Sequence, residues 1–147
     1  MKWAVFLAAT LWAPLSAEEI YLTCQVTQIA AQEGEAKADG KLKKIQKSLG
    51  KSDAVSKYHG FRFVGKKSLS ATKHKAGSVK LKNGKTFSLK VVSVLRAQRK
   101  NTVTVDVETG ESSERKSFMD REHLILTAGQ LDKKSDLVLA VSCPVFP

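Results

Sequence analysis

Three ionisable side chains that lie close together in the sequence, Asp120, Glu122 and His123, form the one grouping of carboxylates with a histidine in this chain. A carboxylate beside an imidazole is suited to metal ligation and to general acid–base catalysis. Either role would need a third group that folding brings in, such as His59 or His74, and a turn before a strand explains the same residues as well. The chain has no Gly-x-Ser-x-Gly element that would mark a hydrolase nucleophile. We therefore expect no catalytic residues, no bound metal and no cofactor, and we keep a small hydrolase as the last alternative.

The segment 60–67, Gly-Phe-Arg-Phe-Val-Gly-Lys-Lys, is close to two ligand-binding motifs and departs from both. It has the glycine spacing of a phosphate-binding loop, but Lys67 stands where a serine or threonine must contact magnesium. It also has the alternating aromatics of an RNA-recognition signature, with Lys66 in place of the final aromatic. The alternation of Phe61 and Phe63 favours a core strand over either motif.

Lysine is the more informative residue type, because the positive charge is segregated along the chain. Residues 41–100 carry fifteen lysines and three arginines against one acid, a net charge of +17, whereas residues 18–40 carry −4 and residues 101–147 carry −3. This segregation predicts a strongly positive surface that attracts anions. The alternative is a passive role, since lysine also protects exposed sheet edges from pairing. The predicted anion-binding residues belong to an expected helix and an expected hairpin: Lys41, Lys43, Lys44, Lys47, Lys80, Lys82, Lys85 and Lys90.

The two cysteines, Cys24 and Cys143, each fall in the apolar phase of an alternating segment, residues 20–26 and 137–143. We expect a disulfide that joins the first strand to the last, with those strands side by side or on facing sheets. Two buried free thiols are the alternative. Neither cysteine has the spacing of a redox or zinc motif, so we expect a structural bond only.

The elements that must position these residues are organised around a hairpin in residues 78–96. Apolar and polar residues alternate on both sides of Asn83-Gly84, which is a strong hairpin signal. Since side chains alternate with a period of two, a three-residue loop over residues 82–84 is needed to place Val79 opposite Phe87. We therefore predict a type I turn closed by a bulge, with Gly84 in the left-handed conformation.

The rest of the chain predicts a mainly β fold. About eight strands separated by turn signals indicate an antiparallel sandwich, with a small barrel as the alternative. Val103, Val105 and Val107 should face the core, and residues 113–119 should form a polar sheet edge. Beyond the hairpin, the strands are expected at residues 20–26, 57–69, 102–108, 113–119, 123–127 and 136–142.

One short N-terminal helix is expected over residues 41–49, where apolar residues recur on one face and lysines occupy the other. Asp39 should cap its start and Gly50 should end it. The small and acidic residues 30–40 before the helix are expected to form a mobile connection. Such a helix could cover one open side of a sheet.

The first seventeen residues have the three parts of a secretory signal, which are Met1-Lys2, the apolar run 3–12 and a small-residue exit that ends at Ala17. A lipid anchor is not expected, because Glu18 stands where a lipoprotein would have cysteine. The mature chain, residues 18–147, has a length typical of one β-rich domain and no further apolar run that could span a membrane. We therefore expect a periplasmic or secreted protein; its oligomeric state is left open.

The order of a helix, a Tyr58-x-x-Phe61 strand and the Leu81-x-Asn-Gly-Lys85 hairpin resembles that of short secreted β-rich proteins of Gram-negative bacteria. This resemblance implies an exported β fold and brings no function with it. From the charge we expect a binding module whose basic face engages an acidic glycan, a lipid headgroup or a nucleic acid in the cell envelope. The alternative is a structural adaptor that holds another envelope protein by a sheet edge or groove.

Overall fold

The computed structural model describes residues 21–34, 40–110 and 112–145. The signal predicted for residues 1–17 and the cap predicted at Asp39 lie outside these residues. The described elements, in chain order, are β1 (Leu22–Gln32), η2 (Gly40–Leu42), α2 (Gln46–Lys51), η3 (Asp53–Val55), β2 (Gly60–Ala71), β3 (Gly77–Lys80), β4 (Thr86–Arg96), β5 (Asn101–Glu108), β6 (Ser113–Met119), β7 (Leu124–Gln130) and β8 (Asp136–Ser142).

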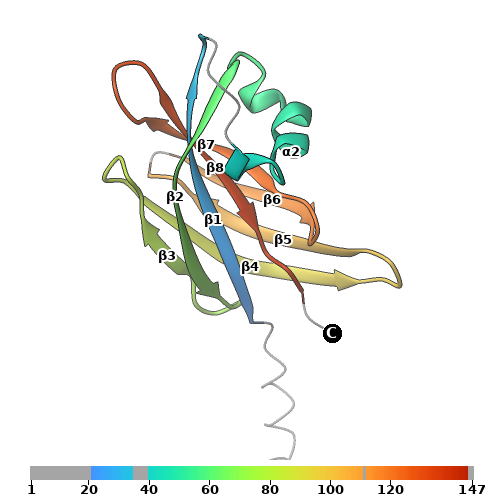
Figure 1. Ribbon diagram of the computed structural model, residues 1–147. Helices are drawn as coiled ribbons and strands as arrows, with labels where there is room; N and C mark the ends of the chain where they lie inside the picture. The colour runs from blue at the N-terminus through green and yellow to red at the C-terminus, as the bar shows by residue number, and fades with distance from the viewer. Residues whose placement is uncertain (1–20, 35–39, 111, 146–147) are drawn as a thin grey trace, which may run out of the picture.

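The eight strands form two antiparallel four-stranded sheets, which confirms the sandwich. Sheet A has the order β2-β1-β8-β7 and sheet B the order β3-β4-β5-β6. The strands of the two sheets cross at a steep angle (Figure 1). Consecutive strands are neighbours except where the chain passes between sheets, from β2 to β3 and from β6 to β7. The chain crosses between the sheets at these two places, but the described strands remain two separate sheets. The fold is therefore a sandwich and not the alternative small barrel.

The main core lies between the two sheets. Val103, Val105 and Val107 of β5 are buried there, as predicted, and face Leu137 and Leu139 of β8. β6 is an edge of sheet B and exposes most of its polar residues, also as predicted.

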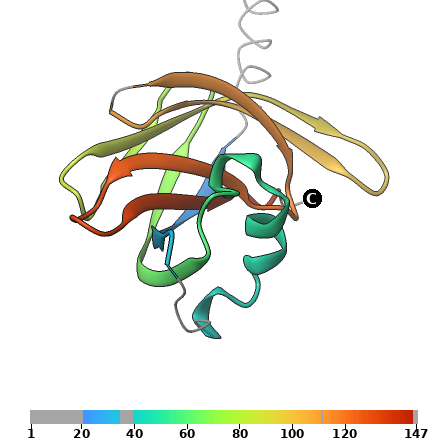
Figure 2. The same cartoon turned by 90° about the horizontal axis from the view of Figure 1, so that it is seen from above.

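A second core lies on the opposite face of sheet A, because residues 40–58 cover part of that face. Leu42, Ile45 and Leu49 pack there against Val138 and Ala140 of β8. Figure 2 therefore shows three layers, with sheet A between sheet B and the helical segment. This arrangement explains why β8 is apolar on both faces.

Tyr58 fixes the end of the helical segment to sheet A. Its side chain is buried, and its hydroxyl donates a hydrogen bond to the carboxylate of Asp136 at the start of β8. Burial, followed by this hydrogen bond and the charge of Asp136, raises the pKa of Tyr58 to about 12.

The β3–β4 hairpin has the predicted register. Val79 pairs with Phe87 and Lys80 with Thr86. Gly84 has φ 85°, and its N–H donates to the carbonyl of Leu81 at 3.0 Å. The alternation of inward and outward side chains was therefore sufficient to predict the three-residue loop.

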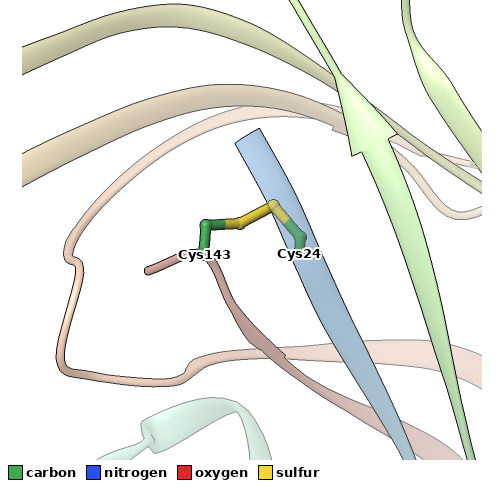
Figure 3. The surroundings of a disulfide bond; sticks show 2 residues. All are labelled: Cys24 and Cys143. Carbon is green, nitrogen blue, oxygen red and sulfur yellow. A yellow bond between two sulfur atoms is a disulfide. The ribbon is translucent and has the colours of Figure 1, made fainter. Parts of the chain in front are cut away.

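The predicted disulfide between Cys24 and Cys143 is present, with 4.3 Å between the two α-carbons (Figure 3). β1 and β8 are adjacent in sheet A, and Gln25 pairs with Ser142 next to the bond. The bond therefore joins neighbouring strands of one sheet, the first of the two predicted arrangements.

The predicted helix over residues 41–49 is wrong in extent. The segment forms the 3₁₀ turn η2, the short helix α2 and the 3₁₀ turn η3, and Gly50 lies inside α2 instead of ending it. No side chain caps α2. A helix this short has little stability of its own in water. The conformation of the segment is therefore set by the packing of Leu42, Ile45 and Leu49 against sheet A.

The predicted connection over residues 30–40 is wrong at its start. β1 continues to Gln32 after a bulge between Gln28 and Ile29, and Ala31 pairs with Phe61 of β2 and Asp136 of β8. Small side chains are needed here because sheet A is covered on both faces. Among the described residues, no helix has the length and apolar character needed to cross a membrane.

Candidate anion-binding groove

A groove of about 620 Å³ lies where α2 meets the turn between β6 and β7. One wall comes from α2 and the turn before it, and the other comes from the end of β6, the turn over residues 120–123 and the start of β7. We call it the basic groove. It is lined by Lys44, Lys47, Ser48, Lys51, Ser52, Phe118, Met119, Arg121, Glu122, His123, Leu124 and Ile125.

The charge of the basic groove is strongly unbalanced. Lys44, Lys47, Lys51 and Arg121 are exposed along it, against the single carboxylate of Glu122. None of these four cations forms an ion pair with a described residue. Like charges held together without counter-charges raise the local positive potential, which favours the entry of an anion.

His123 is the titratable residue with the most altered environment in the groove. It is half-buried, and burial, followed by the charge of Lys66, lowers its pKa below the ordinary value. At neutral pH His123 is therefore a neutral imidazole, able to donate one hydrogen bond to an anion without adding charge.

The groove also has apolar lining. Phe118 is buried beneath it, and Met119, Leu124 and Ile125 are partly buried. An anion bound here would contact hydrocarbon as well as cations, where electrostatic attraction is less screened than in open water.

Asp120, Glu122 and His123, which were considered for metal or acid–base chemistry, belong to one turn but do not line the same cavity. Glu122 and His123 line the basic groove, whereas Asp120 lies on another side of the turn and accepts a hydrogen bond from Asn101 Nδ2 at 3.1 Å. Within residues 21–34, 40–110 and 112–145, no three His, Cys, Asp or Glu side chains lie close enough to hold a metal ion. The segment 60–67 belongs to strand β2, where Phe61 and Phe63 pack against the second core.

The helix lysines predicted to bind anions are divided between the groove and its surroundings. Lys44 and Lys47 line the groove. Lys41 places its ammonium 5.1 Å from the centre of the Phe63 ring, a cation–π contact that covers the second core. Lys43 is exposed on the turn between η2 and α2.

The connected ends of β3 and β4, which carry Lys80, Lys82 and Lys85, lie at the opposite side of the molecule from α2 (Figure 1). The Lys80 carbonyl accepts a hydrogen bond of 2.7 Å from Lys67 Nζ. The Lys82 N–H donates at 2.8 Å to Oε1 of the buried Gln28, which attaches the hairpin to sheet A. The side chain of Lys85 runs past Gly110 to Gly129: a Cβ placed at Gly110 would lie 3.3 Å from Lys85 Cδ, and one placed at Gly129 would lie 2.7 Å from Lys85 Nζ.

Lys90 lies elsewhere, on the outer face of sheet B. It pairs in register with Asp106, which also binds Arg115 through a 2.8 Å ion pair. The Arg115 hydrogen bond lowers the pKa of Asp106 below its ordinary value. The eight predicted lysines therefore occupy three regions, the helical segment, the β3–β4 hairpin and the outer face of sheet B, and two of them lie in the basic groove together with Lys51 and Arg121.

Sequence reasoning missed Lys51, Arg121 and the position of His123 in this groove. Lys51 follows the predicted end of the helix, and Arg121 lies among acidic neighbours in a segment of net negative charge. Only the crossing of the chain from β6 to β7 brings them beside α2, and no local pattern encodes that.

Comparison of this chain with protein-family models, with curated proteins and with solved structures finds no match.

Proposed function

We propose that this protein is a non-catalytic binding module of the periplasm or of the extracellular space, and that the basic groove binds an anionic partner of the cell envelope. The observation that carries the proposal is the group of four exposed cations, Lys44, Lys47, Lys51 and Arg121, with one carboxylate among them. The disulfide supports an oxidising compartment, where such bonds persist.

Recognition by charge is favoured over recognition by base stacking. Stacking of bases needs exposed aromatic faces. Among the described phenylalanine and tyrosine side chains, Tyr21 is the one that is strongly exposed, and it precedes β1 instead of lining the groove. We therefore favour a sulfated or phosphorylated glycan over a nucleic acid, and heparin is a suitable probe.

The test compares retention on immobilised heparin for the mature chain and for two triple variants of equal charge. Lys44→Gln, Lys47→Gln and Lys51→Gln together should elute at clearly lower salt. The control replaces the exposed lysines Lys73, Lys75 and Lys133 by glutamine and should elute close to the mature chain. Equal elution of the two variants would mean that only net charge is sensed, and would overturn the proposal.

The competing function is an adaptor that holds another envelope protein by an apolar contact. The specific observation in its favour is the lining of Phe118, Met119, Leu124 and Ile125 in the same groove. A polyanion complex weakens steeply with ionic strength, whereas an apolar complex does not. Groove-dependent binding that persists in 1 M salt, at which the Debye length is about 3 Å, would therefore favour the adaptor.

A further inference from the structure

A second cationic site lies beside the basic groove, under the β4–β5 hairpin. Three of the five arginines of the chain, Arg96, Arg99 and Arg121, line one open hollow of about 660 Å³. We call it the arginine hollow. Its lining is Arg96, Ala97, Gln98, Arg99, Asn101, Asp120, Arg121, Pro144 and Val145.

Two connections and the chain end build this hollow. The β4–β5 hairpin projects beyond the body of the sandwich in both views (Figures 1 and 2) and carries Arg96 and Arg99. The β6–β7 turn supplies Arg121. Pro144 and Val145 follow Cys143, whose disulfide holds them at the end of β8, and Val145 packs against the main core.

The hairpin tip is ordered by its own hydrogen bonds. The Ala97 N–H donates to the Lys100 carbonyl at 3.0 Å, and Arg96 pairs in register with Asn101. The Asp120 N–H in turn donates to the Asn101 carbonyl at 3.0 Å. The hairpin and the β6–β7 turn are therefore tied together, which fixes the backbones that carry the three arginines relative to one another.

The three guanidinium groups are available to a ligand. They are exposed, and none forms an ion pair with a described residue. The one carboxylate in the lining, Asp120, already accepts the hydrogen bond from Asn101 Nδ2. By contrast, Arg115 on the outer face of sheet B is bound by Asp106 through two of its nitrogens.

We infer that the arginine hollow binds a phosphate or sulfate group. A guanidinium presents a planar fork of N–H donors that matches two oxygens of such a group, whereas a lysine ammonium acts as a point charge. Three forks around one hollow suit a tetrahedral oxyanion, and Val145 and Pro144 form an apolar wall beside it. The inference goes beyond the proposed function, because it concerns recognition by donor geometry instead of by net charge.

The sharpest test keeps the charge and removes the fork. Inorganic pyrophosphate is titrated into the mature chain by calorimetry, and the titration is repeated with Arg96→Lys and Arg99→Lys combined. Binding should weaken by about tenfold. The matched control replaces the two arginines outside the hollow, Arg62→Lys and Arg115→Lys, and should bind like the mature chain. Thermal unfolding of each variant confirms that the fold is retained.

A second arm distinguishes the source of the oxyanion. Vesicles that contain phosphatidylglycerol are tested for binding to the same variants. Loss of vesicle binding in the Arg96→Lys, Arg99→Lys variant indicates a lipid headgroup phosphate, and loss of pyrophosphate binding alone indicates a soluble phosphate. If that variant matches the mature chain in both arms, the inference is wrong.

The two proposals can fail separately. The Lys44→Gln, Lys47→Gln, Lys51→Gln variant should elute from heparin at clearly lower salt and keep pyrophosphate binding. The lysine variants of Arg96 and Arg99 should show the reverse pattern. Arg121 lines both sites and is therefore left unchanged in these comparisons.

Discussion

The contribution of the Cys24–Cys143 bond to stability can be worked out from its position. It closes a sequence separation of 119 residues. In the chain-entropy model a loop of this length destabilises the unfolded state by about 5 kcal/mol, and measured values are usually lower. Both cysteines are fully buried in the main core, so Cys24→Ala with Cys143→Ala also leaves a small cavity. We expect the double variant to lose about 3–5 kcal/mol of unfolding free energy.

The double variant should still fold, because seven register pairs from Gln25–Ser142 to Ala31–Asp136 hold β1 beside β8 without the bond. Equilibrium urea denaturation measures the difference, which should lower the midpoint by about 2 M at an m-value typical of a small domain. A loss below about 1 kcal/mol would refute the loop-closure argument. Intact-mass analysis that finds two free thiols in protein purified without reductant would refute the bond itself.

Three further changes test the fold. Burial and the hydrogen bond to Asp136 raise the pKa of Tyr58 from 10.0 to about 12, so the tyrosine of the unfolded chain ionises first. The unfolding free energy relative to Tyr58→Phe should therefore fall by about 2 kcal/mol between pH 10 and 12. Denaturation of both proteins across that range measures it, and a constant difference would contradict it. A Cβ at Gly77 would lie 2.3 Å from the Ser70 carbonyl oxygen, so Gly77→Ala should cost about 1–3 kcal/mol and lower the melting temperature. Gly84→Ala is the control, because a Cβ there meets no neighbour within 4 Å. Its positive φ alone should lower the unfolding free energy by about 1–2 kcal/mol. A smaller loss of unfolding free energy for Gly77→Ala than for Gly84→Ala would contradict the clash.

The sequence was sufficient to predict the features that depend on period and pairing. The parity of Val79 and Phe87 around Asn83-Gly84 predicted the loop length, and the apolar phase of Cys24 and Cys143 predicted the bond. Both inferences rest on the two-residue alternation of strands, which long-range packing does not alter.

Features that depend on a second layer were not predictable in the same way. β1 continues through Ala30 to Gln32 because this stretch pairs with β2 and the helical segment covers sheet A there. In the sequence the same small residues lack any alternating pattern. The helix was predicted too long because the spacing of Leu42, Ile45 and Leu49 is met equally by a 3₁₀ turn followed by a short helix.

The site was the least predictable part. Charge counted along the chain groups residues 41–100, but the fold distributes them over both sheets and the helical layer. Lys90 consequently lies beside Asp106. Arg121, from a segment of negative net charge, joins the helix lysines because β6 and β7 belong to different sheets.

The salt dependence of heparin binding tests the proposed function most directly. The logarithm of the association constant should fall linearly with the logarithm of salt concentration, with a slope set by the number of cations that contact the polyanion. Replacing Lys44, Lys47 and Lys51 by glutamine should reduce that slope by about 2–3, since each lost contact removes roughly one unit. The Lys73, Lys75 and Lys133 control should keep the original slope. If both triple variants have the slope of the mature chain, the basic groove is not where the polyanion binds.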